Sequence, residues 1–374
     1  MRNAATPPAR GPSPGRILVF PAGVPAALQF CREARSQGRD VVGASSLPFD
    51  PCKAEYDAWA YLPYVHEQDF PRALVEVLEA HQVSEIYAPH EVAAQVLETL
   101  LPGHAPNVKL RSSSPLREIE AAYRGRLAHA RQTGPEWLYL EGGRPRMSAE
   151  WRVGLRAAVD RIPGMTDDDK IEALFEALRY APPGDVVEIG SWWGRSAALL
   201  LLLSRAYGLG AVLCVDPWRN DMLDQGVVAL DRASASMDAD FAYAIFQMNL
   251  APLAAGDINV LRMASAAAAG VYRPGLRVSE PGFGTTGYEG AISVLHIDGN
   301  HAFEHVSEDA AAWIPFVKPG GWIVIDDYVW AFGDGPRVVA DGWLASHWGK
   351  VDVAFVMGTA LFVRLAASGP DQRV

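Results

Sequence analysis

Short apolar runs alternate with amphipathic stretches through the first part of the chain. An apolar run that ends in a glycine turn, residues 16–23, is typical of a buried strand, and the helical pattern at residues 26–37 stops at Gly38. Further strands are predicted at residues 40–45, 58–65 and 85–89, and further helices at residues 70–81 and 91–101. Strands that alternate with helices of this length favour a parallel sheet with right-handed crossovers. Residues 16–112 are therefore expected to form a small α/β domain.

A second and longer α/β pattern occupies residues 166–374. It opens with an amphipathic helix at residues 171–179, and a strand, a helix and a strand are predicted at residues 185–190, 196–207 and 211–216. Near the C-terminus, Gly358-Thr359 joins two predicted strands, residues 351–357 and 360–364, as in a hairpin. Residues 113–165 are expected to be a helical linker. Residues 1–15, rich in Pro, Ala and Gly, are expected to be a disordered tail.

Composition narrows the class of protein. The 374 residues are 49% apolar, which is enough for two domains. The formal net charge is -11 at pH 7, so neither a nucleic acid nor an anionic membrane is the expected partner. Cys31, Cys52 and Cys214 are too scattered for a disulfide framework or a zinc knuckle, which favours a reducing compartment. The longest apolar stretch, residues 197–203, is too short to span a membrane, so a cytoplasmic location is expected.

A glycine turn follows the predicted strand at residues 185–190. Its sequence runs Val186-Val-Glu-Ile-Gly-Ser-Trp-Trp-Gly-Arg-Ser196. A strand that leads through glycines into a helix lets the backbone approach a ligand, and the unpaired amides favour a carboxylate or phosphate. Gly190 permits the turn, and Gly194 lets the helix start lie against the ligand. Asp216 lies at the end of the next strand, where an acid can bind both hydroxyls of a ribose.

This turn and Asp216 together resemble class I S-adenosylmethionine-dependent methyltransferases. The resemblance implies a Rossmann-like seven-stranded sheet with an antiparallel last strand, and S-adenosylmethionine as cofactor. It also implies that the turn holds the methionine part of the cofactor, Asp216 the ribose, and residues after the third strand the adenine. The expected cofactor-binding residues are Glu188, Gly190, Ser191, Trp192, Gly194, Ser196, Asp216, Met263, Ser265 and Asp298. Binding of another nucleotide is the alternative.

A cluster of acids follows two later strands. Asp298 ends one predicted strand, and Asp326 and Asp327 end the next, after the turn Pro319-Gly-Gly321. The carboxyl ends of parallel strands meet at the edge where ligands bind in open α/β folds. Three carboxylates there suit a hard cation such as Mg²⁺, Mn²⁺ or Ca²⁺ better than Zn²⁺. His301 lies close enough in sequence to Asp298 to act as general base on a bound hydroxyl. The alternative is that the acids cap local turns and His301 is a surface histidine.

The segment Ile297-Asp-Gly-Asn-His-Ala-Phe-Glu304, followed by the glycine turn and the acid pair, resembles the macrocin and mycinamicin sugar O-methyltransferases. The resemblance runs from about residue 165 to residue 365. It implies that Asp298, Asp326 and Asp327 bind the metal, Mg²⁺ or another hard divalent cation, and that His301 is the base, with Asp298 also at the reacting centre. Asn300, Phe303 and Asp326 depart from the common family pattern, and these differences bear on the acceptor more than on the chemistry.

The predicted function is therefore methyl transfer to a hydroxyl of a small-molecule acceptor, a sugar or a glycosylated natural product. A vicinal diol or a catechol would chelate the metal through neighbouring oxygens. Transfer to a catechol or polyketide oxygen is one alternative. A non-catalytic module that binds S-adenosylmethionine is another, although a chain without catalysis would not need to keep His301 and the acids.

Other features of the sequence also suggest contacts, segments and a second site. Trp192, Trp193 and Trp330 are the tryptophans best placed to touch a ligand. The glycine-rich stretch at residues 283–288, within a long loop at residues 273–290, is expected to be either a mobile lid or a disordered insertion. Residues 16–112 resemble the domain that precedes the catalytic part of ATP-grasp enzymes. They are expected to be either a structural or oligomerisation domain or the site of a sugar, nucleotide or other ligand. A homo-oligomer is a further expectation.

Overall fold

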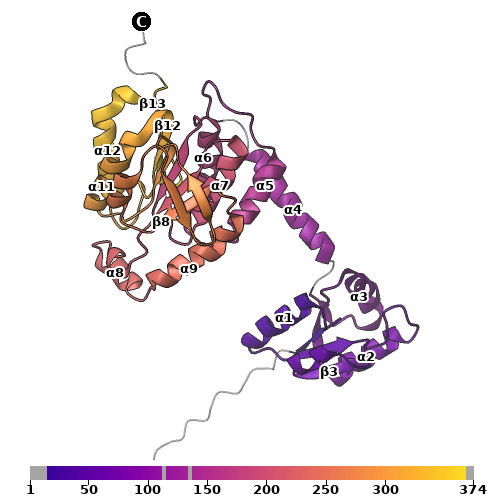
Figure 1. The fold of residues 1–374 in the computed structure, drawn as a ribbon. Helices are drawn as coiled ribbons and strands as arrows, with labels where there is room; N and C mark the ends of the chain where they lie inside the picture. The colour runs from indigo at the N-terminus through magenta and orange to yellow at the C-terminus, as the bar shows by residue number, and fades with distance from the viewer. Residues whose placement is uncertain (1–14, 112–114, 134–136, 368–374) are drawn as a thin grey trace, which may run out of the picture. The chain divides into compact units, whose positions relative to one another are not determined.

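The computed structural model describes residues 15–111, 115–133 and 137–367 (Figure 1). The chain divides into two compact units, residues 1–126 and 127–374. The tail expected at residues 1–15 lies almost wholly outside the described residues. Among the described helices, none is long and apolar enough to cross a membrane.

The first unit is built on a parallel sheet, as the sequence predicts. In its described part the strand order is β3-β2-β1-β4-β5, and every paired strand is parallel. The strands are β1 (Arg16–Val19), β2 (Val41–Ser45), β3 (Ala58–Tyr61), β4 (Val83–Tyr87) and β5 (Lys109–Leu110). The helices are α1 (Pro25–Ser36), α2 (Phe70–Ala80) and α3 (Glu91–His104). Buried aliphatic side chains on both faces of the sheet, such as Leu18 and Ile17, pack against these helices.

The second unit contains the expected seven-stranded sheet within its described residues. The strand order is β13-β14-β12-β11-β6-β7-β8. The strands are β6 (Asp185–Ile189), β7 (Val212–Val215), β8 (Ile258–Leu261), β11 (Ile292–Ile297), β12 (Val317–Ile325), β13 (Val351–Met357) and β14 (Ala360–Leu365). Strand β14 is antiparallel to both β12 and β13, and the other pairs are parallel. This arrangement confirms the Rossmann-like methyltransferase sheet.

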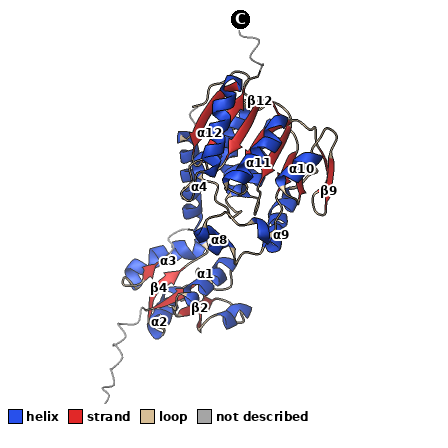
Figure 2. Cartoon of the chain, turned by 90° about the vertical axis from the view of Figure 1, so that its left-hand side faces the viewer, coloured by secondary structure: helices blue, strands red, loops and turns tan. Residues whose placement is uncertain are grey.

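Helices cover both faces of this sheet. One face carries α6 (Asp168–Arg179) and α7 (Arg195–Tyr207), together with α5 (Ala149–Val159) and α9 (Ala239–Leu250), in one apolar cluster. The other face carries α10 (Ser265–Val271), α11 (Phe303–Trp313) and α12 (Gly335–His347), which lie side by side in Figure 2. The remaining helices are α4 (Pro115–Gln132) and α8 (Val228–Ser234). Short 3-10 turns occupy Pro51–Glu55, Asn220–Met222, Ala251–Leu253, Ile314–Phe316 and Trp348–Lys350.

The segment expected to be a linker contributes to the core of the second unit. Leu138, Leu155 and Val159 are buried in the same cluster as the helices α6 and α7. The apolar face of α5 therefore packs against this core. Through these side chains the segment at residues 137–165 is attached to the domain that follows it.

Residues 283–288, expected to be either a mobile lid or a disordered insertion, belong to an ordered hairpin. The strands β9 (Arg277–Glu280) and β10 (Gly284–Gly287) pair as an antiparallel hairpin. The buried Asn259 amide donates hydrogen bonds of 3.0 Å to the carbonyls of Val278 and Gly284. Phe283 is buried, and the Tyr288 hydroxyl donates a hydrogen bond of 2.9 Å to the Val212 carbonyl. These buried anchors attach the hairpin beside β8, so residues 283–288 are not a disordered insertion.

A buried acid lies between α10 and α11. Asp309 is 7% exposed, and the Ser265 hydroxyl beside it accepts a hydrogen bond of 2.8 Å from the Trp313 indole. Burial raises the pKa of Asp309 from 3.8 to about 6, although the hydrogen bond from Ser265 opposes this. An acid whose folded-state pKa is raised destabilises the fold as the pH rises through that interval.

Asp309→Asn should therefore stabilise the protein at pH 8 by up to about 3 kcal/mol, because the amide carries no buried charge. At pH 3.5, where the carboxyl group is largely protonated in both states, the gain should fall to about 0.2 kcal/mol. Urea unfolding of both proteins at the two pH values measures this. An equal effect at both pH values would contradict the assignment of a raised pKa.

Candidate active site

Backbone hydrogen bonds align the predicted site residues along one edge of the second sheet. In four places, the amide of the first residue after a strand donates to the carbonyl of the last residue of the neighbouring strand. The donors are Gly190, Asp216, Asp298 and Asp326, at 2.8, 3.3, 2.8 and 2.9 Å. The parallel register thus continues one residue beyond β6, β7, β11 and β12. As a result, the glycine turn after β6 lies between Asp216 and the acid cluster.

The glycine turn is too crowded for side chains. Gly190 has a φ of +80°, and a Cβ atom there would lie 2.1 Å from the carbonyl oxygen of Asp298. Gly194 has a φ of +88°, and its Cβ would lie 2.1 Å from a methyl group of Leu250. Gly194 is also the N-cap of α7. The two glycines therefore bring bare backbone against the β11 loop and α9.

Asp216 braces this turn. Its Oδ2 accepts hydrogen bonds of 3.0 Å from the amides of Ser191 and Trp192, and its Oδ1 accepts one of 2.8 Å from Trp218. Burial raises the pKa of Asp216, and these three amides oppose the rise. Each carboxylate oxygen can accept more than one hydrogen bond, so Asp216 can hold the turn and still receive ribose hydroxyls.

A buried chain of polar contacts connects the glycine turn to the acid cluster. The Ser191 hydroxyl donates to Glu188 Oε2 at 2.6 Å, and Glu188 Oε1 lies 3.1 Å from His296 Nδ1. Glu188 and His296 are both fully buried. The other ring nitrogen of His296 lies 3.9 Å from Asp298 Oδ2 and 4.0 Å from Asp326 Oδ2. His296 was not predicted from the sequence. The one indication of a role was that a histidine interrupts the apolar run of β11.

Asp298, His301 and Asp327 form a half-buried group on the outer side of the cluster. His301 Nε2 lies 3.0 Å from Asp327 Oδ2 and 4.0 Å from Asp298 Oδ1. Asp327 has a φ of +52°, an uncommon value for a residue with a side chain. One ligand atom from each of these residues lies within 4.8 Å of the others. The structure thus brings together the predicted base and two of the three predicted metal ligands.

The third predicted metal ligand, Asp326, is paired with a lysine that sequence reasoning missed. The Lys170 ammonium donates a hydrogen bond to Asp326 Oδ2 and lies 3.6 Å from Asp298 Oδ2. Lys170 is 1% exposed. Burial alone would lower its pKa, but Asp298 and Asp326 outweigh burial and hold the pKa above its ordinary value. Burial and the Asp326 carboxylate raise the pKa of Asp298, whereas Lys170 and His296 hold that of Asp326 low against its burial.

Further groups fix the loop that carries His301. Its ring lies edge-on to Trp330, with centroids 4.6 Å apart. Its amide donates to the Gln225 side chain at 2.8 Å, and the Asn300 amide group donates to the Asp224 carbonyl at 2.6 Å. The segment after β7 therefore borders the acid cluster. Of the tryptophans singled out in the sequence, Trp330 touches the predicted base.

Three predicted cofactor contacts are less directly tied to this group. Met263 and Ser265 follow β8 at the same edge, but the Ser265 hydroxyl already accepts from Trp313. Met263 is partly buried against the apolar cluster on that face. Ser196 is buried in the first turn of α7. Their contact with the cofactor stays a prediction.

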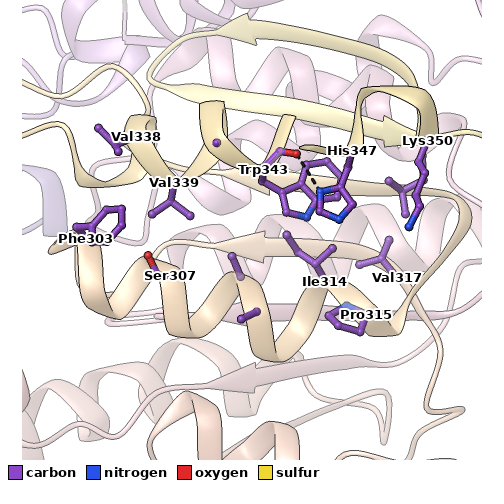
Figure 3. A pocket seen from close by; sticks show the side chains of 14 residues that line it. Phe303, Ser307, Ile314, Pro315, Val317, Val338, Val339, Trp343, His347 and Lys350 are labelled. Atoms are coloured by element: carbon purple, nitrogen blue, oxygen red, sulfur yellow. Dashed lines mark hydrogen bonds between the residues drawn. The ribbon is translucent and has the colours of Figure 1, made fainter. Parts of the chain in front are cut away.

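A separate groove of about 720 Å³ lies between α11 and α12. Figure 3 shows Phe303 and Val338 at one end and Lys350 and Val317 at the other. Trp343 and His347 stack in between, with ring centroids 4.7 Å apart. None of the predicted site residues lines this groove.

Part of the second unit matches a known protein family. Residues 187–328 match the family described as a methyltransferase domain. This segment includes the cofactor turn, Asp216 and the acid cluster. The matched part of the second unit is therefore similar to a methyltransferase domain, in agreement with the resemblance of its motifs.

Several solved structures are similar to part of the chain. The O-methyltransferase NovP is 17% identical with a TM-score of 0.37, over 59% of this chain and 81% of NovP. CalS11, a TDP-rhamnose 3'-O-methyltransferase of calicheamicin biosynthesis, is 12% identical with a TM-score of 0.35, over 57% of this chain and 93% of CalS11. MycE, from mycinamycin biosynthesis and solved with Mg, SAH and mycinamycin VI, is 16% identical with a TM-score of 0.36, over 62% of this chain and 57% of MycE. No curated protein sequence matches the chain.

The crowded turn predicts a sharp effect of Gly190→Ala. The added methyl group meets backbone of the β11 loop at a positive φ, so we expect a loss of about 3 kcal/mol or more in the free energy of unfolding. S-adenosylmethionine binding, measured by isothermal titration, should be lost as the turn shifts.

Gly208→Ala is the matched control. Gly208 has a φ of +61° at the end of α7, with no atom within 4 Å of its added Cβ. Its cost should be only about 1 kcal/mol, with cofactor binding retained. Equal losses in the two variants would show that backbone conformation, not the close approach to Asp298, is what Gly190 provides.

Proposed function

We propose that the chain transfers a methyl group from S-adenosylmethionine to a hydroxyl oxygen of a sugar or glycosylated natural product. The proposal includes a hard divalent cation, with Mg²⁺ as the first candidate, and His301 as general base. The observation that carries it is the convergence of Asp298, His301 and Asp327, one strand away from the cofactor turn. The resemblance of this motif to sugar O-methyltransferases supplies the acceptor class.

The donor set suits such a cation. Asp298 and Asp327 offer carboxylate oxygens on the half-buried side of the cluster, and hard divalent cations prefer oxygen ligands. Among the described residues, neither ring nitrogen of His301 has a hydrogen-bond partner of good geometry, although both are buried. A bound cation and its hydroxyl ligand would satisfy this group. Asp326 is the third candidate ligand, and it is now held by Lys170.

When bound, a divalent cation lowers the pKa of a hydroxyl ligated to it, and S-adenosylmethionine supplies an electrophilic methyl group. Asp298 and Asp327 would hold that cation, while the turn from Gly190 to Gly194 and Asp216 would place the cofactor. Since these residues belong to adjacent strand ends, donor and acceptor would be held close together, which is worth several kcal/mol of the barrier, about 7–11 at best.

His301 would accept the proton of the hydroxyl as its oxygen receives the methyl group. The resulting imidazolium would pair with Asp327, whose carboxylate lies 3.0 Å from Nε2. Trp330 on one side of the ring and the hydrogen bond from the His301 amide to Gln225 limit its movement. A base held in place in this way is expected to contribute roughly 10²–10⁴-fold to the rate.

Three single variants separate these roles. Asp327→Asn should weaken Mn²⁺ binding by at least about 10-fold, because it removes one carboxylate ligand, and should leave S-adenosylmethionine binding within about 3-fold of wild type. His301→Gln should lower methyl transfer by roughly 10²–10⁴-fold with cofactor binding retained. Glu308→Gln removes an exposed charge from α11 and serves as the control.

Titration calorimetry with S-adenosylmethionine and Mn²⁺, and a radiolabelled methyl assay on glycosides, catechols and polyketides, provide the readouts. Failure of the wild type to bind S-adenosylmethionine would overturn the proposal. Turnover with catechols but not glycosides would replace the acceptor class. Cofactor binding with no Mn²⁺ response would leave a reaction in which His301 acts without a metal.

A further inference from the structure

The acid cluster has two sides, and a lysine occupies one of them. The two groups of metal-ligating side chains share Asp298: one contains His296 and Asp326, and the other His301 and Asp327. Asp298 Oδ2 lies 3.6 Å from Lys170 Nζ, whereas its Oδ1 lies 4.0 Å from His301 Nε2. We refer to Lys170, His296 and Asp326 as the inner side, and to His301 and Asp327 as the outer side.

We propose that Lys170 is a built-in cation that keeps Asp326 from binding the metal and thereby limits how tightly the outer side holds a divalent ion. Lys170 is thus a positioning residue. This inference rests on the proposed metal-dependent function, and it concerns a residue that neither the motif nor the matched segment at residues 187–328 includes.

The fold holds Lys170 rigidly in this place. Asp167 is the N-cap of α6, and its Oδ1 accepts a hydrogen bond of 2.8 Å from the Lys170 amide. Its Oδ2 accepts two bonds of 3.2 Å, from the amide and the hydroxyl of Thr359, in the turn between β13 and β14. A Cβ atom on Gly358 would lie 2.2 Å from Asp167 Oδ1, so the turn closely contacts the start of α6.

The same turn also holds Asp326. Thr359 Oγ1 lies 3.2 Å from Asp326 Oδ1, while the Lys170 ammonium binds Oδ2. The Lys170 ammonium therefore occupies one oxygen of Asp326, and the single hydroxyl proton of Thr359, shared with Asp167, faces the other. A divalent cation at Asp298 and Asp327 would find this third carboxylate occupied, and it would also be repelled by the ammonium.

The inference has a measurable consequence for metal affinity. Lys170 is 1% exposed, so solvent screens its charge weakly. Replacing it by an apolar side chain would remove the repulsion and release Asp326 to act as a ligand. Tighter binding of Mn²⁺ by roughly 10- to 100-fold is expected for removal of one such charge.

The test is Mn²⁺ binding to the full chain, measured by electron paramagnetic resonance without acceptor, for wild type and Lys170→Met. Lys318→Met is the matched control, because Lys318 is only partly buried and its ammonium contacts the Pro183 carbonyl instead of an acid. We expect the roughly 10- to 100-fold gain for Lys170→Met and less than about 3-fold change for Lys318→Met. Unchanged or weaker Mn²⁺ binding in folded Lys170→Met would overturn the inference.

A double variant guards against misfolding of the single one. Lys170→Met/Asp326→Asn removes both charges of the buried pair, which proteins often tolerate. If Asp326 is not a metal ligand, the double variant should bind Mn²⁺ within about 3-fold of wild type, since one positive and one negative charge are lost together. A loss of about 10-fold or more would show that Asp326 binds the metal and would overturn the inference.

The outcomes also separate this inference from the proposed function. Mn²⁺ binding by the wild type with no gain in Lys170→Met contradicts the inference alone. Mn²⁺ binding by Lys170→Met but not by the wild type supports the inference and contradicts a metal in the native reaction. An absence of Mn²⁺ binding in both contradicts both.

Discussion

The parallel pairing of β12, β11, β6, β7 and β8 is the constraint on which the site depends. Because the backbone hydrogen bonds continue one residue past four strand ends, Gly190, Asp216, Asp298 and Asp326 lie in a row. Their order in space is set by the strand order and not by their order in the sequence. The glycine turn can then approach the acid cluster closely, since Gly190 has no side chain to collide with Asp298.

The charged side chains buried at this edge of the sheet need partners of opposite charge or hydrogen-bond partners inside the protein. Lys170 pairs with two of the acids, and Glu188 holds the buried His296 beside them. An unpaired buried carboxylate would cost several kcal/mol, so these inner partners stabilise the edge as well as shape it. Asp298 and Asp327 remain half-buried next to His301, where a ligand can reach them. The buried charges of the inner side are paired with one another, which stabilises the fold. The outer side stays accessible to a ligand.

The sequence predicted the parts of the site that follow from local pattern. Gly190, Asp216 and Asp298 each follow an apolar strand, and a parallel sheet brings such positions together. Lys170 could not be predicted in this way, because Asp326 lies 156 residues away and the packing of α6 brings them together. His296 looked like one more residue of a buried strand.

The same reason explains why the sequence did not predict the hairpin at residues 277–287. Their glycines are typical of a loop, whereas the hairpin is held by the amide of Asn259, a residue on another strand. Asp298, in contrast, is fixed by its own strand. The local sequence pattern therefore predicted the sheet and the motif at its edge. Contacts between side chains far apart in the sequence could be found only in the structure.

The most direct test of the account is a crystal structure of the chain with S-adenosylhomocysteine and Mn²⁺, in which anomalous scattering locates the metal. The account predicts the cofactor along the turn from Gly190 to Gly194 and a manganese peak bound by Asp298 and Asp327 beside His301. Cofactor elsewhere, or a manganese peak on the side of Lys170 and His296, would contradict it.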